Sequence, residues 1–160
     1  MGYQVQVKQV KAQPIAVVRR RVNREGLSKA VTDGCGTVWS ILRAQKIPVG
    51  RNIAVYLDSA ITLEAGVELY AQFAGCGNVV SSGTPAGTVA ITVHFGPYNR
   101  LGEAHAAIRQ WCAEQGCRLA GPNWEVYGHW VDEWNEDTSK IRTDVFYLLE
   151  AGPPGRDDSP

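Results

Sequence analysis

One carboxylate in this 160-residue chain stands among residues that suggest chemistry. Glu125 follows Trp124 and lies close to Tyr127 and Trp130. The segment alternates as a β-strand does, and glutamate is disfavoured in strands. A carboxylate beside aromatic rings can bind a cation, and one beside a phenol can activate a water molecule. The segment therefore indicates a site for an apolar small molecule, neutral or cationic; the alternative is a glutamate that faces solvent on a half-exposed sheet.

Tyrosines are the other candidates for a cavity lining, because a phenol is apolar on its ring and polar at its tip. Strand alternation places Tyr127 on the face of Glu125. It places Glu68 and Tyr70 together on a face of an earlier strand. Packing at the edge of a core is the alternative for each tyrosine. The candidate ligand-binding residues are Tyr56, Glu68, Tyr70, Trp111, Glu125, Tyr127 and Tyr147, and the candidate catalytic residues are Glu125 and Tyr56.

The usual catalytic and metal-binding motifs do not occur in the sequence. There is no G-x-S-x-G elbow, no P-loop and no dinucleotide-binding glycine pattern after a strand. The histidines lack metal-type spacing and are expected to be surface or structural residues; they are His94, His105 and His129. The cysteines form no C-x-x-C pair, so we expect free thiols, no metal and no cofactor; they are Cys35, Cys76, Cys112 and Cys117.

Hydrophobic periodicity and turn residues divide the chain into strands and helices. The predicted strands are Val5–Val22, with a bend at Pro14, and residues 53–58, 67–73, 88–95, 124–131 and 142–150. The predicted helices run from a cap at Ser28 to about Gln45, and over residues 99–115, with Gly116 ending the second. Loops are expected over residues 75–87 and 132–140.

The order of elements, βαββ, occurs twice, and the residues repeat as well. Residues 39–56 match residues 111–127: both segments begin with Trp, end with Tyr and contain a glycine at the matching place. The repeat predicts an α+β fold, in which duplicated βαββ units are related by a pseudo-twofold axis. We expect an antiparallel sheet with two main helices and a central ligand cleft between the halves.

Length and composition are those of an ordinary globular protein with a single domain. We place this domain at residues 1–150, with repeat halves of about 3–75 and 86–150, and expect a disordered tail over residues 151–160. Lys+Arg and Asp+Glu both number 16, so the basic excess typical of nucleic-acid binders is missing, and no direct nucleic-acid binding is expected. No stretch approaches the ~20 apolar residues of a membrane span, and the N-terminus lacks a signal peptide's apolar core. We therefore expect a cytoplasmic protein.

Four segments carry a resemblance to a known family. They are G-P-Y at Gly96–Tyr98, Trp111 near the end of a helix, G-P-N-W-E-V-Y at Gly121–Tyr127, and T-D-V-F-Y-L-L from Thr143. In their order and spacing, over about residues 3–150, the chain resembles the GyrI-like effector-binding domains. This family includes gyrase-inhibitor-like proteins and the ligand-binding halves of bacterial multidrug-responsive transcription activators.

The resemblance implies a duplicated βαββ fold with a central hydrophobic, aromatic cleft. It also implies that Glu125 is the buried glutamate that meets the ligand, with Tyr56 and Tyr147 lining the same cleft. Unlike the activators, the chain has no helix-turn-helix segment before the domain, so we expect a stand-alone domain.

Three functions remain open at this point. The leading hypothesis is a stand-alone domain that captures lipophilic aromatic or cationic compounds, for drug sensing or sequestration. The alternative follows from a resemblance to cyclopropanoid cyclopropyl hydrolases, which detoxify DNA-alkylating natural products. There Glu125, its pKa raised by burial, would activate water, and Tyr56 would polarise the ligand. The third is a protein-binding module that inhibits a larger enzyme, but the acidic loop 132–137 is short for such a surface, and no protein partner follows from it.

Overall fold

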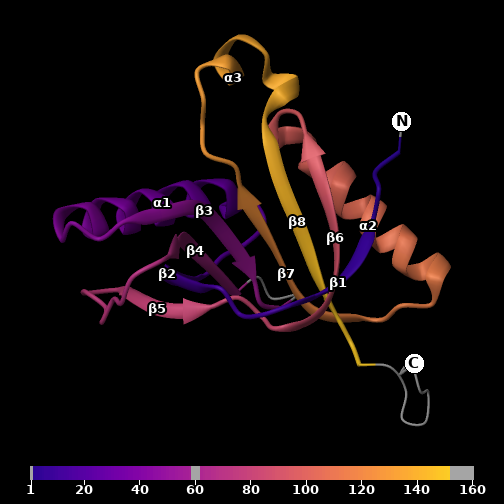
Figure 1. Ribbon diagram of the computed structural model, residues 1–160, viewed down its shortest axis with the longest axis horizontal. Coiled ribbons are helices and arrows are strands. Elements are labelled where there is room, and N and C mark those ends of the chain that lie inside the picture. Colours follow the sequence, from indigo (N-terminus) through magenta and orange to yellow (C-terminus); the bar gives the residue numbers. More distant parts are fainter. Residues whose placement is uncertain (1, 59–61, 152–160) are drawn as a thin grey trace.

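The computed structural model describes residues 2–58 and 62–151. In this part of the chain, eight strands form one antiparallel sheet, in the order β1-β6-β8-β7-β3-β4-β2-β5 (Figure 1). The strands are β1 (Gln6–Val10), β2 (Pro14–Arg21), β3 (Val49–Tyr56), β4 (Thr62–Leu69), β5 (Val79–Gly83), β6 (Gly87–Phe95), β7 (Leu119–Tyr127) and β8 (Arg142–Leu149). The helices are α1 (Leu27–Ala44), α2 (Leu101–Gln115) and the short α3 (Glu133–Glu136), with 3-10 turns η1 (Tyr98–Arg100) and η2 (Thr138–Lys140).

The chain builds the same unit twice, as β2-α1-β3-β4 and as β6-α2-β7-β8, and adds β1 and β5 at the two edges. At the centre β3 pairs with β7, and Ala54 lies opposite Glu125. Each of these residues stands two positions before the tyrosine that ends its strand, Tyr56 or Tyr127. Equivalent positions of the repeat are therefore paired with each other, which places the pseudo-twofold axis between them. The predicted α+β fold of duplicated βαββ units is confirmed.

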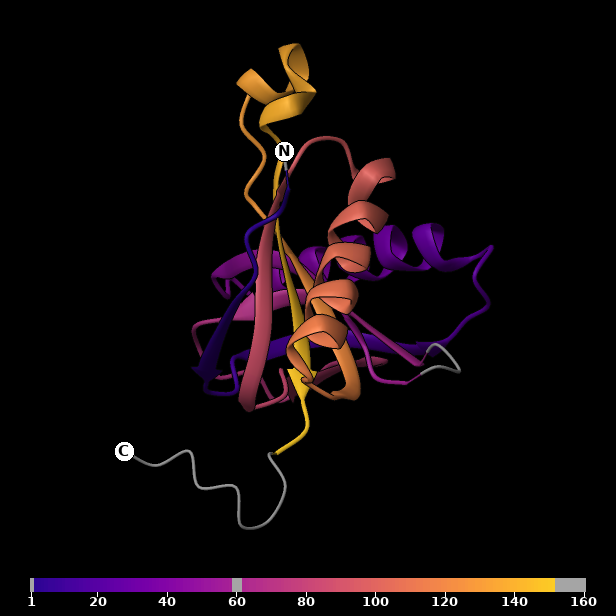
Figure 2. The same ribbon diagram turned by 90° about the vertical axis from the view of Figure 1, so that its right-hand side faces the viewer.

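Both long helices pack on the same face of the sheet. On α1, Val38 and Leu42 contact β2 and β4, and on α2, Ala104 and Ile108 contact β6 and β8. These residues recur at helical spacing, so each helix buries one apolar stripe. The sheet is strongly twisted: in Figure 1 the strands β2 and β5 lie across the view, whereas β6 and β8 lie nearly upright. Figure 2 shows α2 lying along the strands of its own half.

The other face of the sheet has a core of its own, which joins the two halves. Its buried side chains come from β2, β3, β6 and β7, and they are Ile15, Val17, Ile53, Val55, Val89, Trp124 and Val126. In β7 this leaves Trp124 and Val126 on one face and Glu125 on the face of the helices. The alternation read from the sequence therefore holds for this strand.

Two predictions about strands are wrong. Residues Val5–Val22 form two strands in different halves: β1 pairs with β6, whereas β2 pairs with β4 and β5. Pro14 begins β2 rather than bending a longer strand, because proline lacks the N–H that a ladder needs. Residues 75–87, predicted as a loop, contain the edge strand β5, whose mostly polar sequence V-V-S-S-G hides its pairing with β2.

The central strands also begin earlier than predicted. Strand β4 covers residues 62–69 rather than 67–73, and β7 covers residues 119–127 rather than 124–131. In both cases residues typical of turns lie inside the strand. Gly66 is part of β4, while Gly121 and Pro122 lie where the register between β7 and β8 shifts.

Helix boundaries differ less from the predictions. Helix α1 begins after Gly26, and Ser28 lies inside it without a capping hydrogen bond. Helix α2 starts at Leu101 after the turn η1, and Gly116, with φ of 74°, ends it as predicted. The predicted loop over residues 132–140 contains α3 and η2. From residue 152 onward, the predicted disordered tail lies outside the described residues.

The close approach of β2 and β4 can be tested at Gly66. A Cβ at this position would lie 1.8 Å from the carbonyl oxygen of Ala16. We expect Gly66→Ala to lower the free energy of unfolding by about 3 kcal/mol, because the strands must separate. In the matched control, Gly36→Ala, a Cβ meets nothing within 4 Å. Alanine is favoured in a helix, so this variant should gain up to about 1 kcal/mol. Urea unfolding measures both; equal stabilities would contradict the packing described.

Candidate functional site

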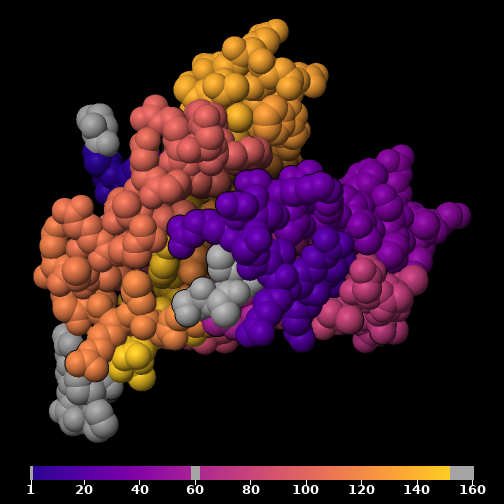
Figure 3. Space-filling model, turned by 180° about the vertical axis from the view of Figure 1, so that it is seen from behind, coloured from indigo at the N-terminus to yellow at the C-terminus, as the bar shows by residue number. Residues whose placement is uncertain are grey.

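Glu125 lies at the centre of the sheet, on the face that carries both helices. The residue is only 6% exposed. Its neighbours on the adjoining strands are small or apolar: Ala54 on β3 and Val145 on β8. These side chains cannot hydrogen-bond a carboxylate. The partners of Glu125 must therefore come from other positions along the strands or from a helix. Figure 3 shows the molecule from the side of the helices, with atoms of β8 (yellow) visible between α1 and α2.

Two phenols, which are equivalents in the repeat, share one oxygen of this carboxylate. Tyr56 Oη donates to Glu125 Oε1 over 3.1 Å, and Tyr127 Oη donates to the same atom over 2.5 Å. The tyrosines end β3 and β7, and because these strands are antiparallel, they approach Glu125 from opposite sides. Each ring is half-buried although the carboxylate is covered. One oxygen atom thus accepts a hydrogen bond from each half of the fold.

The second oxygen of Glu125 contacts a histidine on α2. His105 Nε2 lies 2.6 Å from Glu125 Oε2, and its Nδ1 lies 2.6 Å from the hydroxyl of Tyr147. Arg109, one turn further along α2, donates to the same hydroxyl over 3.0 Å. Arg109 only donates, so Tyr147 Oη accepts from it; in the neutral imidazole Tyr147 can donate its own proton to Nδ1 while Nε2–H donates to the carboxylate, whereas an imidazolium donates from both nitrogens. In the neutral form the chain of donors runs from Arg109 through Tyr147 and His105 to Glu125.

These contacts set the charges of the site. Burial alone raises the pKa of Glu125, but the interactions with His105, together with the hydrogen bonds of both phenols, outweigh it and leave this pKa below its usual value. Burial and the nearby carboxylate raise the pKa of Tyr56 and of Tyr127, so both phenols stay protonated and act as donors. The expectation that burial would raise the pKa of Glu125 is wrong, because three donors reach it.

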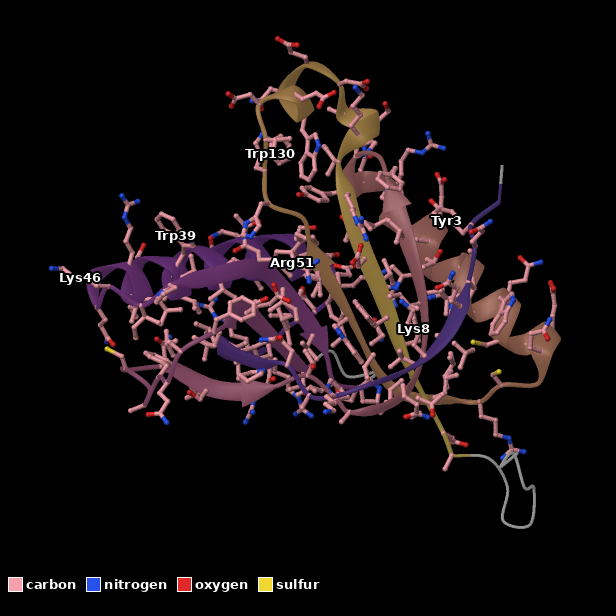
Figure 4. All side chains as sticks on the ribbon, in the orientation of Figure 1. Tyr3, Lys8, Trp39, Lys46, Arg51 and Trp130 are labelled. Carbon is pink, nitrogen blue, oxygen red and sulfur yellow. The ribbon has the colours of Figure 1, made fainter. Side chains whose placement is uncertain are left out.

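An aromatic groove adjoins the Tyr127 end of this network. It has a volume of about 640 Å³ and is lined by α1, the start of β3, η1 and the end of β7. Its aromatic residues are Trp39, Tyr98, Tyr127 and Trp130. The ring of Tyr98 stands edge-on to that of Tyr127, with centroids 5.6 Å apart. In Figure 4, Trp39 projects from α1 and Trp130 lies beyond the end of β7. Tyr127 therefore belongs to both the groove and the Glu125 network.

The structure brings four of the predicted site residues together and places three elsewhere. Tyr56, Glu125, Tyr127 and Tyr147 belong to one hydrogen-bonded network. Glu68 forms a two-pronged ion pair with Arg51 at 3.0 and 3.1 Å, and its strand alternation puts it on the opposite face of the sheet. Tyr70 is 65% exposed and lines a different groove, beside Leu69 and Phe73. Trp111 is half-buried and packs against the core of the second half.

Sequence reasoning missed His105, although a signal for it was present. Leu101, His105, Ile108 and Cys112 follow the spacing i, i+4, i+7 and i+11, which marks the face of α2 that meets the sheet. A histidine within an apolar stripe needs polar partners, and strands β7 and β8 supply them. Arg109 lies one turn beyond His105 on the same side. The groove residues Trp39 and Tyr98 carried no comparable signal, because they are distant in the sequence.

Other features of the described residues limit the chemistry. No group of three His, Cys, Asp or Glu side chains in this part of the chain could hold a metal ion. The four cysteines are free: Cys35 and Cys112 are buried, Cys117 is half-buried and Cys76 is exposed. Among the helices described, none is both long and apolar enough to cross a membrane. The hydroxyl of Thr143, beside Tyr127, is buried without a hydrogen-bond partner in the described structure.

The sequence matches one family model over residues 3–149, that of the GyrI-like small molecule binding domain. The chain belongs to this family. None of the curated proteins matches it. The GyrI-like domain is therefore a small-molecule-binding domain, and its α+β fold with an eight-stranded antiparallel sheet is that of its structural neighbours.

Three solved structures resemble the GyrI-like domain in fold. The EcmrR C-terminal domain is 21% identical, with a TM-score of 0.75 over 95% of this chain and 100% of that one. SAV2435 bound to tetraphenylphosphonium is 10% identical, with a TM-score of 0.66 over 94% and 95% of the two chains. A hydrolase encoded by lin2189 from Listeria innocua is 11% identical, with a TM-score of 0.63 over 93% of both. The match to EcmrR in its complex with DNA (20% identity, TM-score 0.76) covers 94% of this chain but only 58% of the EcmrR chain.

The lowered pKa of Glu125 predicts how stability depends on pH. A carboxyl group with a lowered pKa stabilises the fold above its ordinary pKa, and this contribution is lost as the pH falls through the lowered value. We expect Glu125→Gln to be less stable than the wild type by about 1–3 kcal/mol at pH 7, and the difference to shrink at pH 3. Urea unfolding at both pH values measures it. The control Glu114→Gln, on the exposed side of α2, should change stability by less than about 0.5 kcal/mol. A difference that grows in acid would contradict the pKa direction.

Proposed function

We propose that this GyrI-like domain binds lipophilic organic cations with aromatic surface, and that Glu125 meets their positive charge. The proposal rests on which residues pair with the buried carboxylates. Four carboxylates are buried in the described residues. Glu64 pairs with Arg19, Glu68 with Arg51, and Asp144 with Arg142 and Arg51. Glu125 alone among them contacts neither lysine nor arginine but the imidazole of His105, so beside a neutral imidazole it keeps a negative charge that a ligand can neutralise.

The aromatic groove gives such a ligand a surface for its rings. Trp39, Tyr98 and Trp130 are each 39% exposed or more, which is unusual for side chains of this size. Aromatic faces attract cations as well as apolar rings. The adjoining residues 132–140 contain four acidic residues and one lysine, which favours the approach of a cation.

Binding fits this site better than hydrolysis does. A solved structure of similar fold is a hydrolase, and Glu125 is the carboxylate that would activate water in such a reaction. A general base needs a pKa near the working pH and a free oxygen. Glu125 has a lowered pKa and already accepts three hydrogen bonds. We therefore favour capture of the ligand, for sensing or sequestration. The absence of a basic excess also argues against direct nucleic-acid binding.

Binding of tetraphenylphosphonium tests the proposal, because its charge does not change with pH and its surface is aromatic. We expect the wild type to bind it, and Glu125→Gln to bind it about tenfold to a hundredfold more weakly, since a charge-assisted contact worth about 1.5–3 kcal/mol is lost. Neutral triphenylphosphine oxide should lose much less. Isothermal titration calorimetry at pH 7.5 measures both ligands.

The matched control is Glu68→Gln. It also removes a buried carboxylate, but one that pairs with Arg51 on the opposite face of the sheet. Its affinity for the phosphonium ion should equal that of the wild type, with its fold checked by circular dichroism. Equal affinities of wild type and Glu125→Gln, or an equal loss in both variants, would remove Glu125 from the binding site. Incubation with an activated cyclopropane compound, followed by a search for the hydrolysed product, tests the hydrolase alternative.

A further inference from the structure

We propose that His105 is a specificity-determining residue which, without ligand, occupies the position on Glu125 that the cation of a ligand takes. Binding of a cation and protonation of His105 are then mutually exclusive. This inference rests on the proposed function, since it concerns the same carboxylate. It adds that the site distinguishes ligands by the contact that each makes with Glu125 after the imidazole has moved away.

The geometry leaves only one oxygen of Glu125 for exchange. Oε1 accepts from two phenols that belong to the central strands β3 and β7. Oε2 accepts from His105 alone among the described residues. Moving the phenols would disturb the centre of the sheet, whereas His105 projects from a helix and can turn about its side-chain bonds. Its side chain is 14% exposed and that of Glu125 is 8% exposed, so a ligand reaches the imidazole more readily.

The imidazole has a second hydrogen-bond partner besides Glu125. Its Nδ1 contacts the hydroxyl of Tyr147, which Arg109 holds as a hydrogen-bond acceptor. An imidazole that leaves Glu125 therefore keeps one partner, and its neutral form keeps the proton of Tyr147. The His105 side chain is partly exposed, so an Nε2 that has left Glu125 can be hydrated. The exchange thus costs one hydrogen bond, which a ligand cation replaces with a charged contact.

Protonation of His105 opposes this exchange. An imidazolium on Oε2 neutralises Glu125, and a cation at the same place would meet a like charge at contact distance. The other charged or titratable groups of the network do not supply a competing cation at Oε2, because Arg109 contacts Tyr147 instead. The groups that face the network are Glu125 and Tyr127 from β7, Tyr56 from β3, Tyr147 from β8, Cys35 from α1, and Arg109 and Cys112 from α2.

The consequence is a pH dependence that only cations show. Over the pH range in which the imidazole gives up its proton, the affinity for a cation should rise with pH, by at most about tenfold per pH unit for one displaced proton, and then level off. A neutral ligand makes no use of the charge and should bind with an affinity that does not change. The lowered pKa of Glu125 keeps that group ionised over the same range.

Calorimetry with the same phosphonium ion from pH 5.5 to 8.5 tests the inference. We expect the wild-type affinity to rise at least fivefold over this range. His105→Gln keeps a donor for Oε2 but cannot be protonated, so its affinity should be constant with pH. The control His94→Gln removes a histidine that contacts Tyr3 and the carbonyl of Pro97 outside the groove, and should retain the wild-type dependence. Triphenylphosphine oxide should show no dependence with any of these proteins.

Nuclear magnetic resonance of the wild-type histidines gives an independent readout. By reciprocity, saturating phosphonium should move the titration of His105 to lower pH by the same factor that pH moves the affinity. It should leave His94, which contacts Tyr3 rather than Glu125, in place.

A pH-independent affinity in the wild type, a dependence that His94→Gln abolishes, or an unmoved His105 titration would overturn the inference and leave the proposed function standing. Absence of phosphonium binding at every pH would overturn both.

Discussion

Burial of one ionised carboxylate at the centre of the sheet is the interaction on which the site depends. An unpaired carboxylate in such a place would cost several kcal/mol, so its donors must be present whenever the protein is folded. Tyr56 belongs to the first half of the fold, and Tyr127 and His105 to the second. The two halves must therefore dock with their central strands in one register, because a shift by one residue would turn Glu125 to the other face.

The pseudo-twofold axis explains why there is only one such group. Residues on the axis face their own equivalents, and here these are Ala54 and Glu125. A second glutamate at position 54 would place two buried carboxylates side by side, where one of them would have to stay protonated. The tyrosines two positions later are off the axis, so both can be kept, and both reach the same oxygen. A duplicated fold thus yields one charge with a symmetric pair of donors.

Much of this arrangement was open to prediction from the sequence, for reasons that the residues make clear. The repeat around Tyr56 and Tyr127, together with strand alternation, placed these tyrosines and Glu125 on one face, because pairing of equivalent strands follows from a duplication. The edge strands β1 and β5 escaped prediction because their pairing is set by distant strands and not by their own pattern. The choice of Arg51 as the partner of Glu68 escaped it for the same reason, since ion pairs between strands depend on register and on which side chains reach each other.

The partners of Glu125 also bear on how such a site can be selective. A carboxylate held by arginine is neutralised inside the protein, and a ligand gains little by approaching it. A carboxylate held by phenols and an imidazole is stable without a ligand but keeps its charge. In the proposed exchange, the affinity of a ligand reflects the difference between its own contact with Glu125 and that of the imidazole it replaces. On this proposal, a neutral aromatic compound would fill the groove without improving on His105 at Oε2. Discrimination between ligands would then be a difference of two interactions with one oxygen atom, and the groove would set how much aromatic surface each ligand buries.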